Sequence, residues 1–406
     1  MIESVVGREH VIATPEFQID GLIPALVVKP GSSEEVAECL RVCADLHAAV
    51  IPAGLMTWLE CGNPVTRADV VLSLERMNRI VEYSPPDLTA TVEAGLTLSE
   101  FNRSASAERQ WLPFDPPGAA SASLGAIAAC NSSGALRLGF GTPRDYAIGL
   151  KLAHADGTRS KSGGKVVKNV AGYDMNKLYV GSFGTLAVIT ELTFKLRPLP
   201  ESILTVAVTT KKTQSFAGLA RQVIASGLQP ASIVLTNMPP DETLLLRFAD
   251  NEAAVSHQVN WIIETCEGDY QTVLLSGGED AALWARVAEI DREASCAVRL
   301  SVPLSKSIAA YEMVSGESVV TADLGTGTIR VVRKEIDKAA GGMIERLRAG
   351  CEAQGGMLFI ERAPAFVRRQ MDAWGDVGAT AHLMRSIKEK FDPQSLLNPG
   401  RFVAGI

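Results

Sequence analysis

The residues best suited to chemistry in this chain of 406 residues are glycines rather than acids, bases or nucleophiles. Five glycines interrupt the stretch from Gly163 to Leu196, which ends in an alternating run of β-branched residues. Because glycine has no Cβ, its backbone can lie close to a large flat or charged ligand. The alternating run predicts a half-buried strand. With a second glycine-bearing segment from Gly118 to Gly141, the pattern predicts a nucleotide-type cofactor held mainly by backbone groups.

The second segment lies within Leu112 to Asp145 and is rich in Ala, Ser and Gly. In one interpretation Leu124 to Ala129 is a small-residue helix packed tightly between sheets. In the other, small side chains clear room for a flat ring system, backbone N–H groups face a pyrophosphate, and Asn131 is a polar residue inside the site. A nicotinamide fold would need G-x-G-x-x-G after the first strand, and no such pattern stands near Gly54.

Other chemistry has little support in the sequence. The five histidines (10, 47, 154, 257 and 382) are scattered, and the seven cysteines include no C-x-x-C. This cysteine usage is typical of reduced, mostly buried thiols. It also argues against an iron–sulfur cluster in this chain. We therefore expect no metal site, and no catalytic base can be assigned.

Composition narrows the partners and the location. The net charge is −7 and no basic run stands out, which makes nucleic acid a poor partner. No run of eighteen apolar residues occurs, so we expect no transmembrane segment. The N-terminus has no basic start followed by an apolar region. The expected location is the cytoplasm, with contact to the inner membrane through partners as an option.

The elements that must position the glycines follow from periodicity and capping signals. Ser32 and Glu35 predict the start of an amphipathic helix over 33–47, and Thr97 with Glu100 predicts a second helix. The expected strands of this part are 26–30, 50–52, 70–74, 80–83 and 89–94, the last two joined as a hairpin. This order favours an α+β fold over a doubly wound parallel sheet.

The composition changes after Pro198-Leu199-Pro200, which we take as a domain boundary. The expected domains are 1–200, 201–385 and a C-terminal tail, 386–406. The second domain is expected to be an antiparallel sheet with helices on one face, as two repeats of a split β-α-β unit. Its expected strands are 203–209, 232–236, 244–247, 328–332 and 357–360, and its expected helices are 213–226, 251–265, 280–293 and 334–353.

Three stretches together resemble a known family: residues 112–145, residues 163–197 and the terminal FDPQSLLNPGR. They resemble the FAD-binding proteins of the vanillyl-alcohol oxidase and p-cresol methylhydroxylase (PCMH) type. Within that superfamily they are most similar to the FAD-binding, E-type subunits of bacterial glycolate oxidases. The resemblance implies a PCMH-type domain of two subdomains that clasp FAD, a cap domain over the flavin ring, and a tail that returns to it.

The resemblance also implies cofactor-binding residues. The first pyrophosphate loop falls on Pro52, Ala53, Gly54, Leu55, Met56 and Thr57, and the adenosine-side strand falls on Gly184, Thr185, Leu186, Ala187, Val188 and Ile189. The second pyrophosphate and ring segment falls on Gly118, Ser123, Leu124, Gly125, Ala126, Asn131, Gly134 and Gly141, and Asn398 is the tail residue near the flavin. The family usually has glycines where this chain has Leu55 and Met56, so both side chains are expected to intrude on the diphosphate site.

The function implied is that of an FAD-binding oxidoreductase subunit that oxidises glycolate or a similar small 2-hydroxy acid. Its implied partners are a catalytic flavoprotein subunit and an iron–sulfur subunit. Arg330 and Arg362 are the candidates for binding the substrate carboxylate, and the competing interpretation makes them solvated charges or an Arg362–Glu361 pair. Two further alternatives are a scaffold subunit with little or no flavin and a self-sufficient D-lactate-type dehydrogenase.

Overall fold

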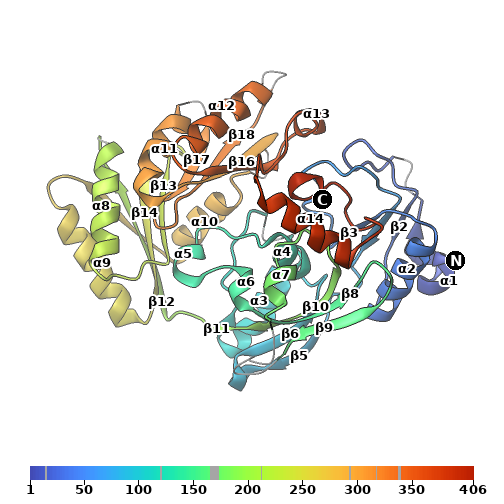
Figure 1. The fold of residues 1–406 in the computed structure, drawn as a ribbon. Coiled ribbons are helices and arrows are strands. Elements are labelled where there is room, and N and C mark those ends of the chain that lie inside the picture. The colour runs from blue at the N-terminus through green and yellow to red at the C-terminus, as the bar shows by residue number, and fades with distance from the viewer. Residues whose placement is uncertain are drawn as a thin grey trace.

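The computed structural model describes residues 1–13, 16–118, 121–164, 173–211, 213–291, 294–316, 318–336 and 340–406, and only the backbone of 213 and 214. Residues 165–172, which belong to the glycine-bearing stretch identified in the sequence, lie outside these ranges. The described chain forms two small sheets, a two-stranded pair and one large sheet (Figure 1).

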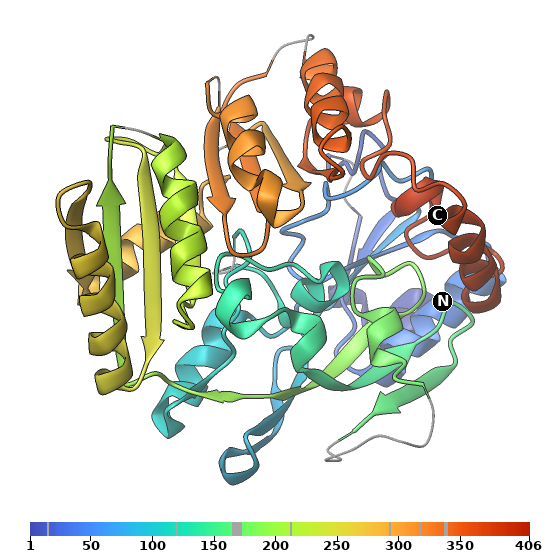
Figure 2. The same ribbon diagram turned by 60° about the vertical axis from the view of Figure 1, so that its left-hand side comes forward.

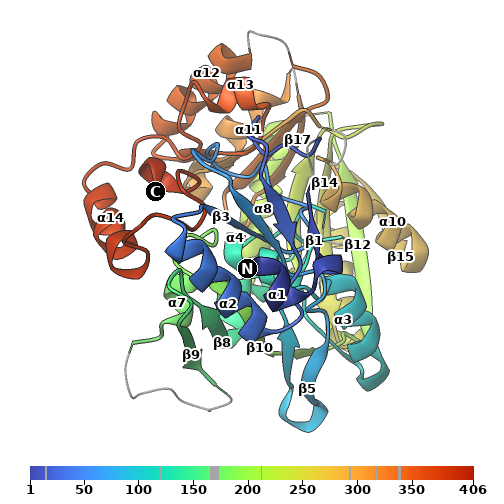
Figure 3. The same cartoon turned by 90° about the vertical axis from the view of Figure 1, so that its right-hand side faces the viewer.

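The first small sheet has the order β1-β2-β4-β3 and contains the loop predicted to hold a pyrophosphate. Its strands are β1 (Val11–Ile12), β2 (Leu26–Val28), β3 (Val50–Ala53) and β4 (Val70–Ser73), with α1 (Ile2–Val6) and α2 (Ser33–Asp45). Strand β4 pairs in parallel with both β2 and β3. Helix α2 begins where expected, since the Ser32 hydroxyl accepts the Glu35 N–H, while the Glu35 carboxylate accepts from Gly31. Figure 3 views this sheet from the side of α1 and α2.

The second small sheet has the order β5-β6-β10-β8-β9 and is antiparallel. Its strands are β5 (Ile80–Ser84), β6 (Thr89–Glu93), β8 (Ala147–Ala153), β9 (Arg159–Gly163) and β10 (Val188–Lys195). The predicted hairpin is confirmed as β5–β6, and the predicted alternating strand is confirmed as β10 at the centre of the sheet. The helices of this part are α3 (Leu98–Ala105), α4 (Leu124–Cys130), α5 (Arg137–Phe140), α6 (Pro143–Tyr146) and α7 (Asn176–Tyr179), and β7 (Gln110–Trp111) pairs with β11 (Arg197–Pro198).

The large sheet has eight antiparallel strands in the order β15-β12-β14-β13-β17-β18-β16-β19. Its first half is β12 (Ser202–Thr209), α8 (Thr213–Ala225), β13 (Ser232–Thr236), β14 (Thr243–Asp250), α9 (Glu252–Cys266) and β15 (Gln271–Ser276). Its second half is β16 (Cys296–Ser301), α11 (Ser307–Ser315), β17 (Val319–Asp323), β18 (Thr328–Arg333), α12 (Ala340–Glu352) and β19 (Met357–Arg362). Each half has the chain order strand-helix-strand-strand-helix-strand, as expected of two split β-α-β repeats.

Helices cover both faces of the large sheet, whereas the sequence predicted helices on one face. The four repeat helices α8, α9, α11 and α12 share one core cluster with alternate residues of the strands, such as Ile233 and Leu235. Helix α10 (Gly277–Ala288) joins the halves and packs Trp284 on the other face, against Val234 and Leu245. The period of two along β13 explains why neighbouring residues belong to different clusters. The view in Figure 2 separates the repeat helices from the small sheets.

The C-terminal tail pairs with the first small sheet. After α13 (Ala365–Arg368) and α14 (Thr380–Phe391), the Val50 N–H donates to Leu396 and the Asn398 N–H donates to Val50. Lys388 on α14 is buried and donates to the carboxylate of Asp392 and to two backbone carbonyls. Burial lowers the pKa of Lys388. None of the helices in the described ranges is both long and apolar enough to cross a membrane.

Candidate active site

A cavity of about 770 Å³, here called the first chamber, lies between β3, α4 and the turn before β10. Most side chains around the chamber are apolar. Many predicted cofactor-binding residues line it, namely Pro52, Ala53, Gly54, Met56, Thr57, Ser123, Gly125, Ala126, Gly184, Ala187, Val188, Ile189 and Asn398. The structure therefore brings the first loop, the second segment and the tail to one cavity.

Two glycines let α4 approach the sheets along one wall of the first chamber. A Cβ on Gly54 would lie 2.0 Å from the Ser123 hydroxyl, which caps α4 by accepting the Ala126 N–H. A Cβ on Gly125 would lie 2.7 Å from Ala94 Cβ. Small residues are thus required for close packing, and the packed helix in turn forms a wall of the chamber. The tight packing of this helix confirms the first interpretation of the small-residue segment, and a flat ring with a pyrophosphate beside the helix stays a prediction.

The opposite wall is formed by the turn before β10 and by the tail. Gly184 has φ of 66°, which favours glycine, and a Cβ built on it would lie 3.6 Å from Pro52. Asn398 donates from Nδ2 to the Phe183 carbonyl at 2.7 Å. Its Oδ1 is buried and accepts no hydrogen bond in the described parts of the chain. An unpaired acceptor beside a cavity is a place for a ligand N–H group, because leaving it unpaired costs free energy.

The two unusual side chains of the first loop behave differently. Leu55 is 37% exposed and does not line the chamber, so the expectation that both side chains intrude is wrong for Leu55. Met56 does line it, and has φ of 61°, a left-handed conformation that glycine adopts without strain. The loop thus keeps a glycine-type backbone at position 56 while it carries a side chain there.

The other predicted binding residues lie around the first chamber without lining it. Leu124, Thr185 and Leu186 are buried in the packing behind its walls. Asn131 ends α4 and accepts the Arg144 N–H, so its amide supports a turn. Gly118 and Gly141 have positive φ in turns, and the Gly134 N–H donates to Asp115.

A second cavity, of about 460 Å³ and here called the second chamber, adjoins the first. Both chambers share Trp58, Cys61, Cys130 and Phe183 in their walls. The remaining wall comes from the large sheet and nearby loops and is strongly charged. It consists of Pro117, Ser132, Asp291, Arg299, Phe359, Glu361 and Arg362. The apolar chamber and the charged chamber therefore lie side by side, and the four shared residues form their common wall.

Of the two arginines predicted to bind the substrate, one lines the second chamber and the other does not. Arg330 is buried and donates from Nε to Glu361 at 2.7 Å, and it does not line the second chamber. Arg362 lines the chamber and donates to the Asp291 carbonyl. The proposed Arg362–Glu361 pair is wrong, because Glu361 binds Arg330 instead. The pairing of β19 with β16 shifts register at this point, so a bulge lets Glu361 and Arg362 line the same chamber.

Arg299 is the chamber residue that the sequence reasoning missed. It lies on β16 directly opposite Arg330 on β18, and its Nε is 3.4 Å from the Glu361 carboxylate. Burial lowers the pKa of Arg299, against the attraction of Glu361. For Glu361, burial opposes ionisation, but Arg330 and Arg299 together lower its pKa below the usual value. The available signal was a lone arginine inside the apolar run Cys296–Val302, which predicts a buried strand.

The second chamber also holds an acid suited to proton transfer. Asp291 is 7% exposed, and burial raises the pKa of its carboxyl group above the usual value. Arg330 and Arg362 oppose that shift. A carboxylate with a raised pKa is a stronger base than an ordinary one. Asp291 can thus accept a proton from a ligand in this chamber.

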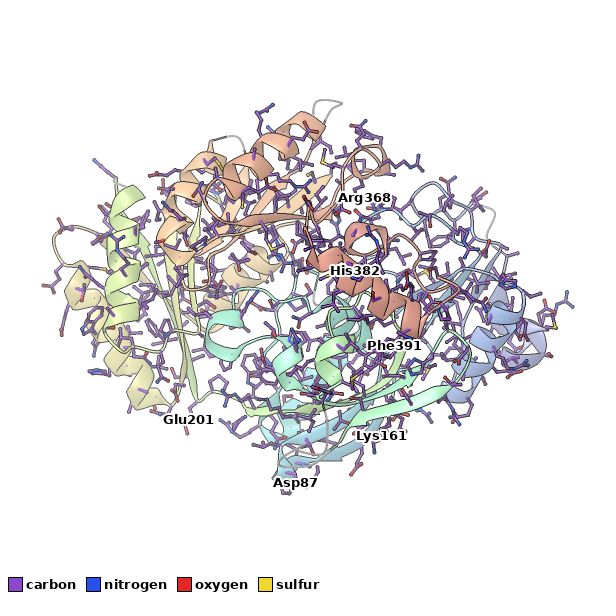
Figure 4. The ribbon with its side chains drawn as sticks, viewed as in Figure 1. Asp87, Lys161, Glu201, Arg368, His382 and Phe391 are labelled. Atoms are coloured by element: carbon purple, nitrogen blue, oxygen red, sulfur yellow. The ribbon has the colours of Figure 1, made fainter. Side chains whose placement is uncertain are left out.

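A buried arginine closes the first chamber at its tail side. Arg401 is 3% exposed, donates to the Asn63 carbonyl at 2.9 Å and pairs with Asp20 at 3.1 Å. Burial lowers the pKa of Arg401, and Asp20 opposes that shift. Asp20 also pairs with Arg368, which Figure 4 places where α13 meets the N-terminal part of the chain. The chamber thus has a fixed cation at one end.

Comparison with known proteins defines the class. Residues 24–163 match the family model described as FAD binding domain. The fold is that of p-cresol methylhydroxylase with substrate bound, which covers 98% of this chain and 95% of its own at a TM-score of 0.77 and 15% identity. Alkyldihydroxyacetonephosphate synthase has the same fold, with a TM-score of 0.75 and 16% identity over 98% of this chain and 84% of that one. The predictions of a PCMH-type α+β fold and of FAD as the cofactor are confirmed.

The particular relatives are hydroxy-acid flavoproteins. Glycolate oxidase subunit GlcD of Bacillus subtilis is 33% identical over 263 residues, which is 64% of this chain and 54% of that protein. D-lactate dehydrogenase of Anaerostipes hadrus is 25% identical over 93% of this chain and 89% of its own. The chain spans about half the length of the first curated relatives that it matches. It is thus related to FAD-dependent oxidoreductases, while the narrower likeness to E-type subunits stays a prediction.

The residues of the first chamber fit FAD. The apolar walls suit a flat ring, the unpaired Asn398 oxygen suits an imide N–H, and Arg401 suits a ring that gains negative charge. The glycines 54, 125 and 184 leave backbone rather than side chains at the walls. Met56 is the feature that fits least well.

Proposed function

We propose that this chain binds FAD in the first chamber and oxidises a small 2-hydroxy acid held in the second. The observation that carries the proposal is the common wall of the two chambers, which contains Trp58, Cys61, Cys130 and Phe183. This wall lies between an apolar, glycine-walled cavity and one lined by two guanidinium groups and two carboxyl groups. The names of the relatives, a glycolate oxidase subunit and D-lactate dehydrogenases, support the substrate class.

Each charged group of the second chamber has a role in this proposal. Arg299 and Arg362 bind the substrate carboxylate, because a planar guanidinium can hold it with two hydrogen bonds. Asp291 accepts the proton of the substrate hydroxyl group, since its raised pKa makes it an effective base. Bound FAD supplies the acceptor for the hydride from the substrate carbon. Phe359 and Trp58, which line the second chamber, exclude water from it.

We further propose that the chain works as a subunit, with a catalytic flavoprotein and an iron–sulfur protein as partners in the cytoplasm. Neither chamber contains a histidine in its described walls. Within the described ranges no group of three or more His, Cys, Asp or Glu residues could hold a metal. Electrons therefore need an external acceptor, which a partner would supply. A self-sufficient D-lactate-type dehydrogenase is the competing proposal, supported by the D-lactate dehydrogenase relatives.

The proposal is tested on the purified chain after incubation with FAD and gel filtration. We expect flavin absorption near one equivalent and loss of the oxidised band when glycolate or D-lactate is added without oxygen. Arg299→Lys should retain weak bleaching and Arg299→Met should abolish it, while both variants keep the flavin. A colourless protein would favour the scaffold alternative. Flavin that no 2-hydroxy acid reduces would contradict the substrate assignment. Rapid turnover by the chain alone with a dye acceptor would favour the self-sufficient enzyme.

A further inference from the structure

Two cysteines from different elements lie in the common wall of the two chambers. Cys61 belongs to the loop after β3, and Cys130 is the last residue of α4. Both line the first chamber and both line the second. The other five cysteines are buried, whereas these two are half-buried. A solute that enters either chamber can therefore reach this pair, and only this pair among the seven.

The surroundings favour reaction at Cys61. A hydrogen bond to Cys61, followed by burial, raises the pKa of the Cys130 thiol well above its usual value. The raised pKa disfavours the Cys130 thiolate, so Cys61 is the nucleophile of the two. Arg401 donates to the Cys61 carbonyl at 3.5 Å, and Arg299 lines the same chamber. The thiolate is the reactive form of cysteine. Glu361 is the opposing carboxylate in the wall of this chamber.

We propose that Cys61 and Cys130 form a redox-active dithiol, which hydrogen peroxide oxidises to a disulfide within the common wall of the two chambers. The Cys61 thiolate attacks one peroxide oxygen, an S–O bond forms, and the O–O bond breaks to release hydroxide. The Cys130 sulfur then attacks the Cys61 sulfenic acid, the S–S bond forms, and the leaving hydroxide takes the Cys130 proton. The hydroxide released in the first step takes a proton from solvent and becomes water. Overall, one hydrogen peroxide is reduced to two waters, and the two thiols lose two electrons to form the disulfide.

The disulfide would link two walls of the first chamber. The loop that carries Met56 and Thr57 would be tied to α4, whose first turn contains Gly125. A cross-link between two walls restricts their separation, so any ligand in the chamber would leave more slowly. The expected change is at least a threefold slower release of FAD from the oxidised protein, reversed by a thiol reductant.

The test treats the full chain with a small excess of hydrogen peroxide, denatures it and counts thiols. We expect the count to fall from seven to five. A peptide map should contain a pair of peptides linked by a Cys61–Cys130 disulfide. The mass of this pair should be lower by two hydrogen atoms than the summed mass of the two reduced peptides. Cys61→Ser and Cys130→Ser should each form no such disulfide. Cys43→Ser is the matched control, because Cys39 and Cys43 are a close but buried pair on α2 and should not react.

Three results would overturn the proposal. The first is a count that stays at seven, and the second is oxidation of Cys39 and Cys43 at the same rate. The third is accumulation of Cys61 sulfinic acid without any disulfide, which would show that Cys130 does not resolve the sulfenic acid. Because the disulfide is measured on the unmodified chain, the conclusion does not depend on whether the serine variants fold. Flavin content is measured separately, so failure of the proposed function does not mask the result.

Discussion

Asp20 and Arg368 are 348 residues apart and form an ion pair at 2.5 Å in which neither side chain is exposed to solvent. Asp20 also pairs with Arg401, so one carboxylate joins the N-terminal segment, the segment after the large sheet and the tail. Removing one member of a buried ion pair usually costs roughly 3–5 kcal/mol, because the partner stays buried and charged. The pair thus connects the two parts of the molecule around the first chamber.

Asp20→Asn is therefore expected to lower the free energy of unfolding by about 3–5 kcal/mol. Denaturant unfolding monitored by circular dichroism measures the change. Glu34→Gln is the control, because Glu34 pairs with Arg159 at the surface and exposed pairs contribute roughly 0–1 kcal/mol. Equal stability of the two variants would show that the buried pair does not hold the parts together.

Met56→Gly is expected to tighten FAD binding. The left-handed φ of 61° costs a non-glycine residue roughly 1–2 kcal/mol, and the Met56 side chain lines the first chamber. Glycine relieves the strain and frees space, so FAD affinity should rise several-fold in a fluorescence titration. Arg109→Gly relieves similar strain at φ of 51° far from the chamber, and should leave affinity unchanged. An unchanged affinity in Met56→Gly would mean that the side chain does not obstruct the cofactor.

Much of the fold could be predicted because it depends on local signals. The β5–β6 hairpin, the Thr97–Glu100 capping box and the two split β-α-β repeats follow from turn residues, caps and periodicity. Strands β15, β16 and β17 were missed, although the apolar run around Arg299 in β16 is typical of a buried strand. The function of Arg299 depends on its register opposite Arg330 and on the bulge at Glu361, which long-range pairing alone determines.

Asp291→Asn is expected to slow substrate oxidation without loss of the bound flavin. The amide cannot accept a proton, so the rate of flavin reduction should fall by roughly 100-fold or more, as expected for loss of a general base. Stopped-flow reduction across pH measures it, and the wild-type rate should rise as Asp291 loses its proton. Arg362 donates to the backbone carbonyl of Asp291 and keeps that contact in the variant. A similar rate and pH profile in Asp291→Asn would remove this residue from the mechanism.

Stability is expected to fall as pH rises from about 4 to about 7, owing to Asp323 and Asp115. Burial raises the pKa of Asp323 to about 6 and that of Asp115 to about 7. The folded state therefore holds these protons more tightly than the unfolded state, so their contribution is greatest below the unfolded pKa and is lost as pH passes the folded pKa. Chemical unfolding at several pH values measures the slope.

Asp323→Asn separates this effect from other titrations. The amide oxygen can still accept from the Gly325 and Thr326 N–H groups, and the second carboxylate oxygen of Asp323 has no partner in the described residues. We expect a gain on the order of 2 kcal/mol at pH 8, and a smaller slope between pH 4 and 7. The surface variant Glu389→Gln should change neither. A loss of stability at pH 8 would contradict burial as the cause.

Asn398→Gly tests whether the unpaired Asn398 oxygen serves the cofactor. Asn398 has φ of 46°, so glycine preserves the tail backbone, including the N–H that donates to Val50, and removes only the amide. If Oδ1 accepts the imide N–H of FAD, loss of this hydrogen bond should weaken FAD binding by about 1–2 kcal/mol. The dissociation constant measured by titration should then be roughly tenfold larger. Ser395→Gly is the matched control, because its φ of 49° lies in the same tail but outside the chamber. Equal FAD affinity in both variants would show that the Asn398 amide only holds Phe183 in place.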